Sequence, residues 1–394
     1  MTTANTTGTA VLAQGARAEA TIDLGALRGN LDALRARTAG PALMAVVKAD
    51  AYGHGAVRCA REAVAAGVGW LGTAMPEEAL ALRAAGIGPE QARILCWLWT
   101  PGGPWQQALR AQVDISVSAQ WALEELLAAV RETGVPGRVH LKADTGLGRN
   151  GCQPHDWPDL VAAALRAQAG GLIEVVGLWS HLAAADEPGH PSVQAQLDSF
   201  EAALAYAERA GVRPEVRHLA NSPATLLLPD SYYDLVRTGL AMYGLSPVPE
   251  VGTPADFGLR PVMSLTARLA LVKTVPGGHG VSYGHHYTTS GPTTLGLVPV
   301  GYADGIPRHA SGTGPVLIGG KWRTVAGRVA MDQFVVDLGG DTPAVGEEVV
   351  LFGTGEHGEP TAEDWGRACG TLSYEIITRI GARVPRRYVG STTS

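Results

Sequence analysis

The chain has 394 residues, of which 46% are hydrophobic and 17% charged, a composition typical of an ordered globular protein with room for two domains. Its net charge of −6, without any block of Lys and Arg, argues against a nucleic-acid partner. No apolar run is long enough to span a membrane, and residues 1–17 predict a disordered tail rather than a signal peptide. The four scattered cysteines predict reduced thiols of a cytoplasmic protein, with neither a disulfide framework nor a metal site: Cys59, Cys96, Cys152 and Cys369.

After the tail, residues 18–24 predict a strand and residues 25–37 a helix, and the pattern leaves open whether this strand joins a barrel or a later sheet. From residue 41 to about 244, short apolar runs alternate with amphipathic segments, which is typical of repeated βα units. The predicted strands are 43–48, 70–74, 93–99, 114–118, 139–143, 175–181, 215–219 and 235–238. Helical patterns include 57–66, 77–85, 120–132, 159–168 and 193–210.

Eight strands, each followed by a crossover, predict an α/β fold with a (β/α)8 TIM-type barrel over residues 18–256. An open doubly wound sheet is the alternative, but it usually has fewer strands and a GxGxxG turn, which is absent here. Residues 257–394 predict a mostly antiparallel β domain, because apolar runs alternate there with Gly, Pro and Asp turns. Its predicted strands are 263–275, 294–299, 314–318, 322–326, 329–338 and 347–352, with helices at 362–369 and 374–380.

Unusual polar residues follow several of the predicted barrel strands. Because active sites of such barrels lie at the C-terminal ends of the strands, we expect these residues to converge on one face. They are Lys48, residues 142–149, His181, Asn221, Ser222, Arg237 and Gly239.

Lys48 is predicted to lie where the first barrel strand leaves the apolar core. Desolvation there would lower its pKa from ~10.4 and leave more neutral amine, which suits a lysine that forms an imine with a carbonyl compound. The alternative is a lysine that merely extends from the strand end into water. The chain has only four lysines among 31 basic residues, which favours a specific role for Lys48, although GC-rich coding would also explain the preference for Arg.

Nine short motifs lie in a fixed order along the chain. They are AVVKADAYGHG (45–55), LKADTGLGRNG (141–151), SHLAAADE (180–187), HLANSPA (218–224), VRTGLAMYG (236–244), VSYG (281–284), GYADGIPR (301–308), GRVAMDQ (327–333) and LSYEIITRI (372–380). Each motif alone is weak. Together they resemble the alanine racemases, bacterial fold-type III enzymes that depend on pyridoxal 5′-phosphate (PLP), over residues 18–388.

The resemblance implies that Lys48 holds PLP through an imine and also serves as one of two bases. Tyr52, Ser222, Tyr374 and the backbone of Gly239 and Leu240 would bind the phosphate, and His181 and Asn221 would complete the cofactor site. Arg237 would face the pyridine nitrogen. A guanidinium can only donate a hydrogen bond, so it would leave that nitrogen unprotonated and favour racemisation over transamination.

Racemisation needs a second base on the opposite face of the planar intermediate. By resemblance this base is Tyr283, supplied by the partner subunit of a head-to-tail homodimer with shared sites. A phenol with a pKa of ~10 is a poor base at neutral pH, and His181 with Arg237 would form the relay that assists it, supported by His218.

Further roles follow from the same resemblance. Arg149 and Met331 would contact the substrate, Met331 from across the dimer, and Lys142 would be carbamylated so that its negative charge orients Arg149. Four residues would narrow the access corridor to alanine: Asp186, Tyr302, Arg308 and Arg328.

The expected reaction is therefore interconversion of L-alanine and D-alanine, which supplies D-alanine for peptidoglycan. A PLP-binding homeostasis protein is one alternative, but that class lacks a second β domain. A broad-specificity racemase or a fold-type III decarboxylase is the other, and the tyrosine of the VSYG motif argues against decarboxylation.

Overall fold

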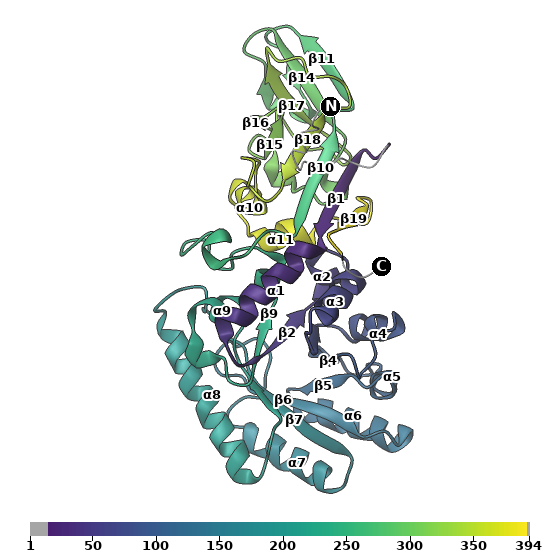
Figure 1. The fold of residues 1–394 in the computed structure, drawn as a ribbon, viewed down its shortest axis with the longest axis vertical. Coiled ribbons are helices and arrows are strands. Elements are labelled where there is room, and N and C mark those ends of the chain that lie inside the picture. Colours follow the sequence, from purple (N-terminus) through teal and green to yellow (C-terminus); the bar gives the residue numbers. More distant parts are fainter. Residues whose placement is uncertain (1–14, 392–394) are drawn as a thin grey trace, which may run out of the picture. The chain divides into compact units, whose positions relative to one another are not determined.

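The computed structural model describes residues 15–391 and divides them into two compact units (Figure 1). One unit comprises Ala26–Arg260, and the other combines the residues up to Gly25 with Pro261–Ser391. The predicted disordered tail lies outside the described residues, apart from its last three positions. Within residues 15–391, every helix is too short or too polar to cross a bilayer.

The unit Ala26–Arg260 contains eight parallel strands that follow one another in chain order around a nearly closed barrel, so the predicted fold is confirmed. They are β2 (Ala42–Val46), β3 (Trp70–Thr73), β4 (Arg93–Cys96), β5 (Asp114–Val117), β6 (Gly137–Lys142), β7 (Ile173–Trp179), β8 (Val216–His218) and β9 (Leu235–Thr238). The last strand, β9, pairs with β2. At the remaining junction, between β8 and β9, the amide of Arg237 donates to the carbonyl of Ala220 at 3.0 Å.

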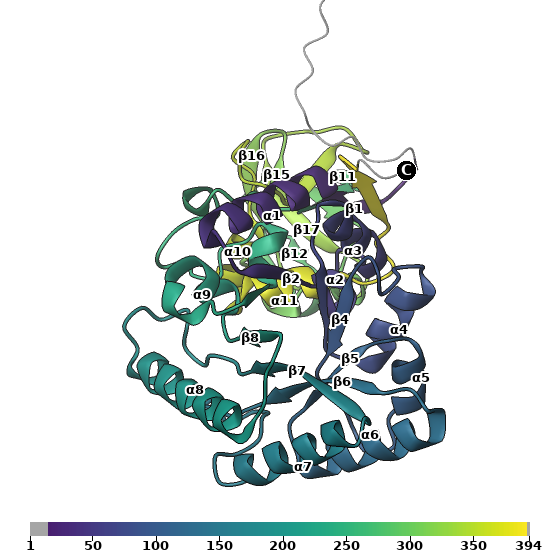
Figure 2. The same ribbon diagram turned by 60° about the horizontal axis from the view of Figure 1, so that its bottom comes forward.

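Helices lie outside this barrel, as Figure 2 shows for α4 to α8. The helices are α1 (Leu24–Thr38), α2 (Lys48–Tyr52), α3 (Ala56–Ala65), α4 (Pro76–Ala84), α5 (Trp105–Arg110), α6 (Gln120–Thr133), α7 (Trp157–Ala169), α8 (Pro191–Ala210) and α9 (Ser222–Leu227). One predicted boundary is wrong at a place that matters. The first barrel strand was expected to reach Lys48, but it ends at Val46 and Lys48 begins α2. The apolar run continues through Val47, so hydrophobicity alone did not reveal the turn.

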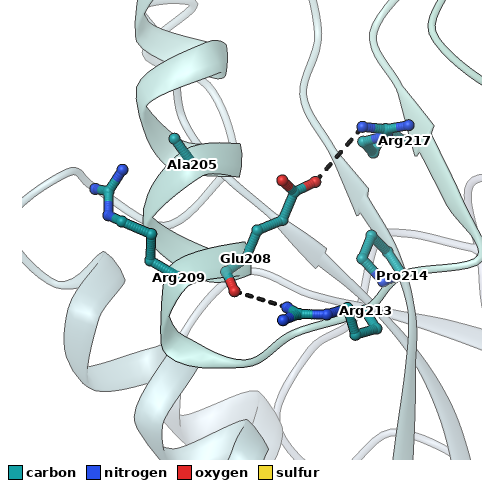
Figure 3. Close-up of a pocket in the computed structure, with 6 residues that line it drawn as sticks. All are labelled: Ala205, Glu208, Arg209, Arg213, Pro214 and Arg217. Carbon is teal, nitrogen blue, oxygen red and sulfur yellow. Dashed lines mark hydrogen bonds and ion pairs between the residues drawn. The ribbon is translucent and has the colours of Figure 1, made fainter.

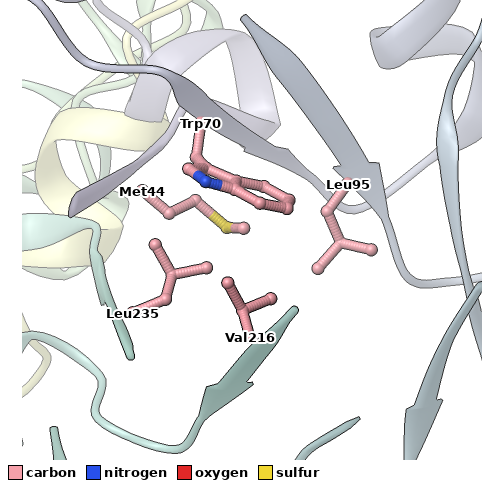
Figure 4. Packing of buried hydrophobic residues seen from close by; sticks show 5 residues of the cluster. All are labelled: Met44, Trp70, Leu95, Val216 and Leu235. Atoms are coloured by element: carbon pink, nitrogen blue, oxygen red, sulfur yellow. The ribbon is translucent and has the colours of Figure 1, made fainter. Parts of the chain in front are cut away.

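Part of the barrel interior is packed with apolar side chains. Met44, Trp70, Leu95, Val216 and Leu235 form one buried cluster, and they come from five different strands (Figure 4). The packing is close, because a Cβ atom placed on Gly72 would lie 2.9 Å from the Met44 sulfur. Truncation of a buried residue such as Met44 to alanine typically costs about 2–5 kcal/mol.

The second unit is mostly antiparallel, as predicted. Its six-stranded sheet has the order β16-β15-β18-β10-β1-β19, and a three-stranded sheet has the order β11-β14-β17. The strands are β1 (Ala18–Asp23), β10 (Met263–Arg268), β11 (Leu271–Val275), β12 (Gly280–Val281), β13 (Tyr287–Thr288), β14 (Thr293–Val298), β15 (Pro315–Ile318), β16 (Lys321–Thr324), β17 (Phe334–Gly339), β18 (Glu348–Phe352) and β19 (Arg386–Val389), with helices α10 (Ala362–Cys369) and α11 (Ser373–Thr378).

Strand β1 answers the question that the sequence pattern left open. It pairs antiparallel with β10 and parallel with β19, so it belongs to this sheet and not to the barrel. A second boundary differs from its prediction: the strand expected at 329–338 begins only at Phe334. The preceding residues form a turn, in which the amide of Ala330 donates to the carbonyl of Gln333 at 2.9 Å.

Candidate active site

Lys48 opens a single turn of left-handed helix. The four residues after it, Ala49 to Tyr52, all have φ between 51° and 55°. The turn is closed by backbone hydrogen bonds, such as the 2.9 Å bond from the amide of Ala51 to the carbonyl of Val47. For residues other than glycine this conformation costs about 1–2 kcal/mol each, so the surroundings must hold the turn in place. One helical turn separates Lys48 from Tyr52, and the Lys48 Nζ lies 5.9 Å from the centre of the Tyr52 ring.

The carboxylate of Glu78 on α4 is one of the groups that hold this turn. Its Oε1 accepts the amide of Ala49 at 2.6 Å, while its Oε2 accepts the amides of Ala74 and Met75 at 2.9 and 3.0 Å. The carboxylate therefore ties the turn after β2 to the end of β3. On the other side, the hydroxyl of the fully buried Tyr243 donates to the carbonyl of Val46 at 2.9 Å.

The environment of Lys48 favours a neutral amine. Burial lowers the pKa of Lys48, the nearby charge of Arg149 lowers it further, and the carboxylate of Glu78 opposes both effects. This direction agrees with the expectation from the sequence. A neutral amine is the form that attacks an aldehyde.

Tyr52, Ser222 and Gly239 form a small polar cradle in the same unit. The Ser222 Oγ accepts the amides of Gly239 and Ala241 at 2.9 and 3.3 Å. A Cβ atom on Gly239 would lie only 2.3 Å from the Tyr52 hydroxyl, so the cradle requires glycine here. Leu240, which begins the 3-10 helix η2 (Leu240–Tyr243), continues the same backbone. The cradle thus gathers hydroxyl and amide groups that suit a phosphate.

Asn221 has a local structural task at this end of the barrel. Its side chain accepts the amide of Ala224 at 3.2 Å and so caps α9. The cofactor contact expected of Asn221 stays a prediction.

Arg237 is a buried guanidinium, 5% exposed. Its Nη1 donates to His218 Nδ1 at 3.0 Å. Its Nη2 donates to the carbonyls of Ser180 and Leu219 at 2.8 and 3.0 Å, and to His181 Nδ1 at 3.3 Å.

Burial lowers the pKa of Arg237 to about 9, so it still carries its charge at neutral pH. Burial and the charge of Arg237 hold the pKa values of His181 and His218 well below the usual value, so both rings are neutral acceptors.

Lys142 and Arg237 both lie over the indole ring of Trp179. The Lys142 Nζ is 4.3 Å and the Arg237 Cζ 4.8 Å from the ring centre. Burial, with the charges of Arg237 and Arg149, lowers the pKa of Lys142 to about 7. Arg149 itself is exposed, in a loop shaped by Asp144, whose carboxylate accepts the amides at positions 146 and 148.

The β unit carries several of the predicted residues on three connected loops. Tyr283, at the start of the 3-10 helix η4 (Tyr283–His285), is 70% exposed, and Met331 is 51% exposed. The hydroxyl of Ser282 donates to the carbonyl of Arg328 at 2.7 Å. The amide of Tyr302 donates to the carbonyl of Ala330 at 3.1 Å, so the loops that bear Tyr283, Tyr302 and Met331 are joined by hydrogen bonds.

The other predicted residues are more scattered within their own units. Asp186 is exposed and follows β7, Arg308 is exposed at the start of the 3-10 helix η6 (Arg308–Ala310), and Tyr374 is half-buried in α11. The roles expected of these three residues stay predictions.

Sequence reasoning missed several residues that shape the barrel site. Glu78 could have been noticed as an acidic residue in the first turn of a helix that begins with Pro76. The role of Trp179 could not be predicted from the sequence, because a tryptophan within an apolar run is expected to be an ordinary core residue. Two buried polar residues deeper in the barrel, Asp114 and His140, were read simply as parts of strands.

A separate hollow of about 710 Å³ lies elsewhere on the barrel unit, between the end of α8 and the start of β8 (Figure 3). Glu208 accepts hydrogen bonds there from Arg217 through its carboxylate and from Arg213 through its backbone carbonyl. This hollow is at the N-terminal side of a barrel strand, whereas Lys48 and Arg237 lie toward C-terminal ends. Because active sites of such barrels lie at the C-terminal ends of the strands, we do not expect the chemistry in this hollow.

Comparison with known proteins decides the family. The family model for the N-terminal domain of alanine racemase matches residues 22–247, and the model for the C-terminal domain matches residues 262–388. The chain belongs to the alanine racemase family. The alanine racemase of Streptomyces coelicolor is 71% identical over 98% of this chain and 99% of that protein, and the one from Frankia casuarinae is 58% identical over 95% and 96%.

Solved alanine racemases have the same fold. The structure of the Streptomyces coelicolor enzyme covers 95% of this chain and 98% of its own, with a TM-score of 0.94 and 72% identity. The alanine racemase from a D-cycloserine-producing Streptomyces lavendulae covers 96% and 98%, with a TM-score of 0.94 and 65% identity. The resemblance stated from the motifs is thereby confirmed.

Proposed function

We infer that this protein is an alanine racemase, an isomerase that interconverts L-alanine and D-alanine with PLP held by Lys48. The observation that carries the proposal is the 71% identity to a curated alanine racemase over nearly the whole chain, joined to a half-buried lysine with a lowered pKa at the barrel mouth. Membership of the family makes D-alanine supply for peptidoglycan in the cytoplasm the expected biological role.

The residues at the barrel mouth fit the three demands of PLP. Lys48 offers an amine to the aldehyde, the cradle of Tyr52, Ser222 and Gly239 suits the phosphate, and Arg237 offers N–H groups to the ring nitrogen. When bound, the coenzyme withdraws electrons from the amino acid and makes its α-hydrogen removable. Arg237 would leave the ring nitrogen of the bound coenzyme unprotonated, because a guanidinium donates and does not accept hydrogen bonds.

Two bases then handle the proton on opposite faces of the substrate. Lys48 serves one face, and Tyr283 of the partner subunit serves the other. Tyr283 is suited to such a role because it is exposed on its own subunit. His181, a neutral ring that accepts a hydrogen bond from Arg237, supports the tyrosine.

Substrate recognition depends on the positive charge of Arg149 and on a narrow access corridor. Arg149 binds the alanine carboxylate through its two-pronged guanidinium, and Met331 of the partner lines the same pocket. Four side chains restrict the access corridor to small amino acids: Asp186, Tyr302, Arg308 and Arg328. Because Tyr283 and Met331 come from the second chain, the active unit is a homodimer.

Lys142 is proposed to be carbamylated. A pKa of about 7 leaves much of the Lys142 amine neutral at physiological pH, and a neutral amine reacts with carbon dioxide to give a carbamate and a proton. The resulting anion would offset the positive charges of Arg149 and Arg237 and would orient Arg149. A mass spectrum of the native protein that lacks one added carbon dioxide would argue against the modification.

The test of the proposed function is the substitution Lys48→Ala. We expect the purified protein to show an absorption band near roughly 420 nm from the PLP imine, and borohydride reduction should fix the coenzyme on the peptide that contains Lys48. Lys48→Ala should lose both the band and the racemisation of alanine. A variant that keeps either property would refute the assignment.

Substrate assays separate this function from the alternatives. Racemisation should be fast with alanine and slow with serine and lysine, and no carbon dioxide should be released. Release of carbon dioxide would indicate a decarboxylase, and similar rates with lysine would indicate a broad-specificity racemase.

A further inference from the structure

A line of hydrogen bonds crosses the interior of the barrel from Arg237 to Arg138. Arg237 Nη1 lies 3.0 Å from His218 Nδ1, and His218 Nε2 lies 3.0 Å from His140 Nδ1. His140 Nε2 is 3.4 Å from Asp114 Oδ2, and Asp114 Oδ1 accepts from Arg138 Nε at 3.1 Å. The first four residues of this line, from Arg237 to Asp114, are each at most 5% exposed. The line therefore connects the proposed cofactor site with an ion-paired residue at the opposite end of the strands.

The two ends of this line fix every proton within it. Arg237 can only donate, so His218 Nδ1 must accept and the His218 proton must sit on Nε2. That proton is donated to His140 Nδ1, and the proton on His140 Nε2 is then donated to the Asp114 carboxylate. Both rings are neutral in this arrangement, which agrees with the low pKa of His218. Asp114 thus acts as the final acceptor, and its charge selects one tautomer for both histidines.

None of the hydrogen bonds described for Arg237 ends on a carboxylate. Its hydrogen-bond partners are two carbonyls and two imidazoles. The charges that lower the pKa of the adjacent His181 are all positive: Arg237, Arg149, Lys142 and Lys48. The first anion along its hydrogen bonds is Asp114. Because hydrogen bonds polarise one another in a medium of low dielectric constant, the two imidazoles carry part of the influence of this carboxylate to Arg237.

Neighbouring residues of the barrel pack closely around the rings of His140 and His218. A Cβ atom on Gly177 of β7 would lie 2.0 Å from His140 Nδ1, so only glycine leaves room there. Trp179 stacks on His218 with ring centres 5.3 Å apart and planes inclined by 10°, and Trp70 meets His140 edge-on at 5.6 Å. Neither ring can turn freely, so the orientation of the hydrogen bonds is fixed by packing.

We propose that Asp114 and His140 are positioning residues, which fix the tautomer of His218 and thereby keep Arg237 charged and aimed at the ring nitrogen of the cofactor. The inference rests on the proposed function only for its last step. The tautomer of His218 and the charge of Arg237 belong to the protein without any cofactor.

The first measurement uses cofactor-free full-length protein labelled with ¹⁵N in histidine. In the unsubstituted protein at pH 7, imidazole NMR should show His218 and His140 as neutral rings protonated on Nε2. In Asp114→Asn, the amide NH2 can donate to His140 Nε2, which moves the protons of both rings to Nδ1 and breaks the hydrogen bond from Arg237 to His218, so the Nδ1-protonated form of His218 should appear. Glu174→Gln is the matched control, since Glu174 is an exposed partner of Arg138 outside the line. It should leave the histidine signals unchanged.

The second measurement uses the PLP-loaded enzyme. If the Arg237 guanidinium loses its proton more easily, the ring nitrogen of the cofactor gains a proton more readily. Transamination should then compete with racemisation. We expect the fraction of turnovers that end in transamination to rise at least about tenfold in Asp114→Asn, with kcat lowered and KM for alanine little changed. His140→Phe fills the same space without an acceptor, so it should give the same result if Asp114→Asn does not fold.

These measurements separate the possible failures. A folded Asp114→Asn or His140→Phe variant with unchanged His218 tautomer and unchanged transamination fraction overturns the proposal, even if its activity falls. If the unsubstituted protein binds no PLP, the proposed function fails, while the histidine spectra of the cofactor-free protein still decide the tautomer. A protonated Nδ1 on His218 in the unsubstituted protein would also overturn the proposal.

Discussion

The mouth of the barrel and the loops of the β unit both carry predicted catalytic residues, but they present them differently. At the barrel mouth, Arg237 is almost fully buried and bonded on several sides, and burial lowers the pKa of Lys48. On the loops of the β unit, Tyr283 and Met331 are largely exposed. Chemistry that needs shifted pKa values depends on burial, so the barrel groups are prepared within one chain. The exposed loop groups would be buried only if another surface covered them.

The two regions also hold strained backbone in different ways. The left-handed turn after Lys48 is fastened by the carboxylate of Glu78, whereas Ser282, with φ of 60°, is fastened by its own hydroxyl to the carbonyl of Arg328. Strain of this kind persists only where the surroundings over-determine the conformation. The barrel turn therefore depends on a residue from another βα unit, and the loop depends on a neighbouring loop.

The largest expected effect tests whether the exposed loop works only in a pair of subunits. Lys48→Ala and Tyr283→Ala should each be nearly inactive, and Tyr283→Ala should keep its thermal stability because the side chain is exposed. When the two variants are unfolded and refolded together in equal amounts, half of the dimers are mixed and each has one intact site. Activity should therefore recover to about a quarter of the normal value. If no activity is recovered, the two subunits do not share an active site. The proposed difference between the barrel mouth and the exposed loops would then be wrong.

A smaller effect is expected where the barrel turn is fastened. The two carboxylate oxygens of Glu78 accept three backbone amides, and Glu78→Gln leaves only one acceptor oxygen for them. An amide that loses its acceptor costs about 1–3 kcal/mol. Hydrogen exchange in the peptide that contains Ala49 should accelerate by roughly ten- to a hundredfold, and PLP should be lost faster on gel filtration. Glu77→Gln, an exposed neighbour on the same helix, is the control. Equal exchange rates in both variants would show that Glu78 does not hold the turn.

The smallest expected effect concerns the burial of Lys142. Its pKa falls from an ordinary 10.5 to about 7 on folding, so between these pH values the unfolded chain binds a proton that the folded chain lacks. The free energy of unfolding of the cofactor-free protein should therefore rise with pH across this window. In degassed buffer, Lys142→Met should reduce the rise and stabilise the protein at pH 7 by about 1–3 kcal/mol.

Urea unfolding at several pH values between 7 and 10 measures this dependence. Lys321→Met is the control, because Lys321 is exposed and paired with Asp341. The lowered pKa of Lys48 leaves part of the rise in place in both variants. Identical slopes for Lys142→Met and the unsubstituted protein would contradict the assignment of the low pKa to Lys142.

Local sequence pattern was enough for the architecture. Alternating apolar runs and amphipathic segments located all eight barrel strands, and the turns of residues 257–394 correctly predicted a mostly antiparallel β fold there. The pattern works because burial on one or both faces imposes a period on hydrophobic residues. It misplaced the ends of the strands at Val46 and before Phe334, where apolar residues continue beyond the hydrogen-bonded ladder.

The sequence alone was enough to identify the family, through motifs such as those around Lys48, Arg149 and Arg237, and so to predict which residues carry chemistry. What only the tertiary structure decided were pairings between residues far apart in the chain: β1 with β10, Glu78 with Ala49, and Asp114 with His140 and His218. The physical reason is that such contacts depend on where distant strands end in space. A local pattern records which side of an element is apolar, but it does not record which polar group a buried side chain will meet.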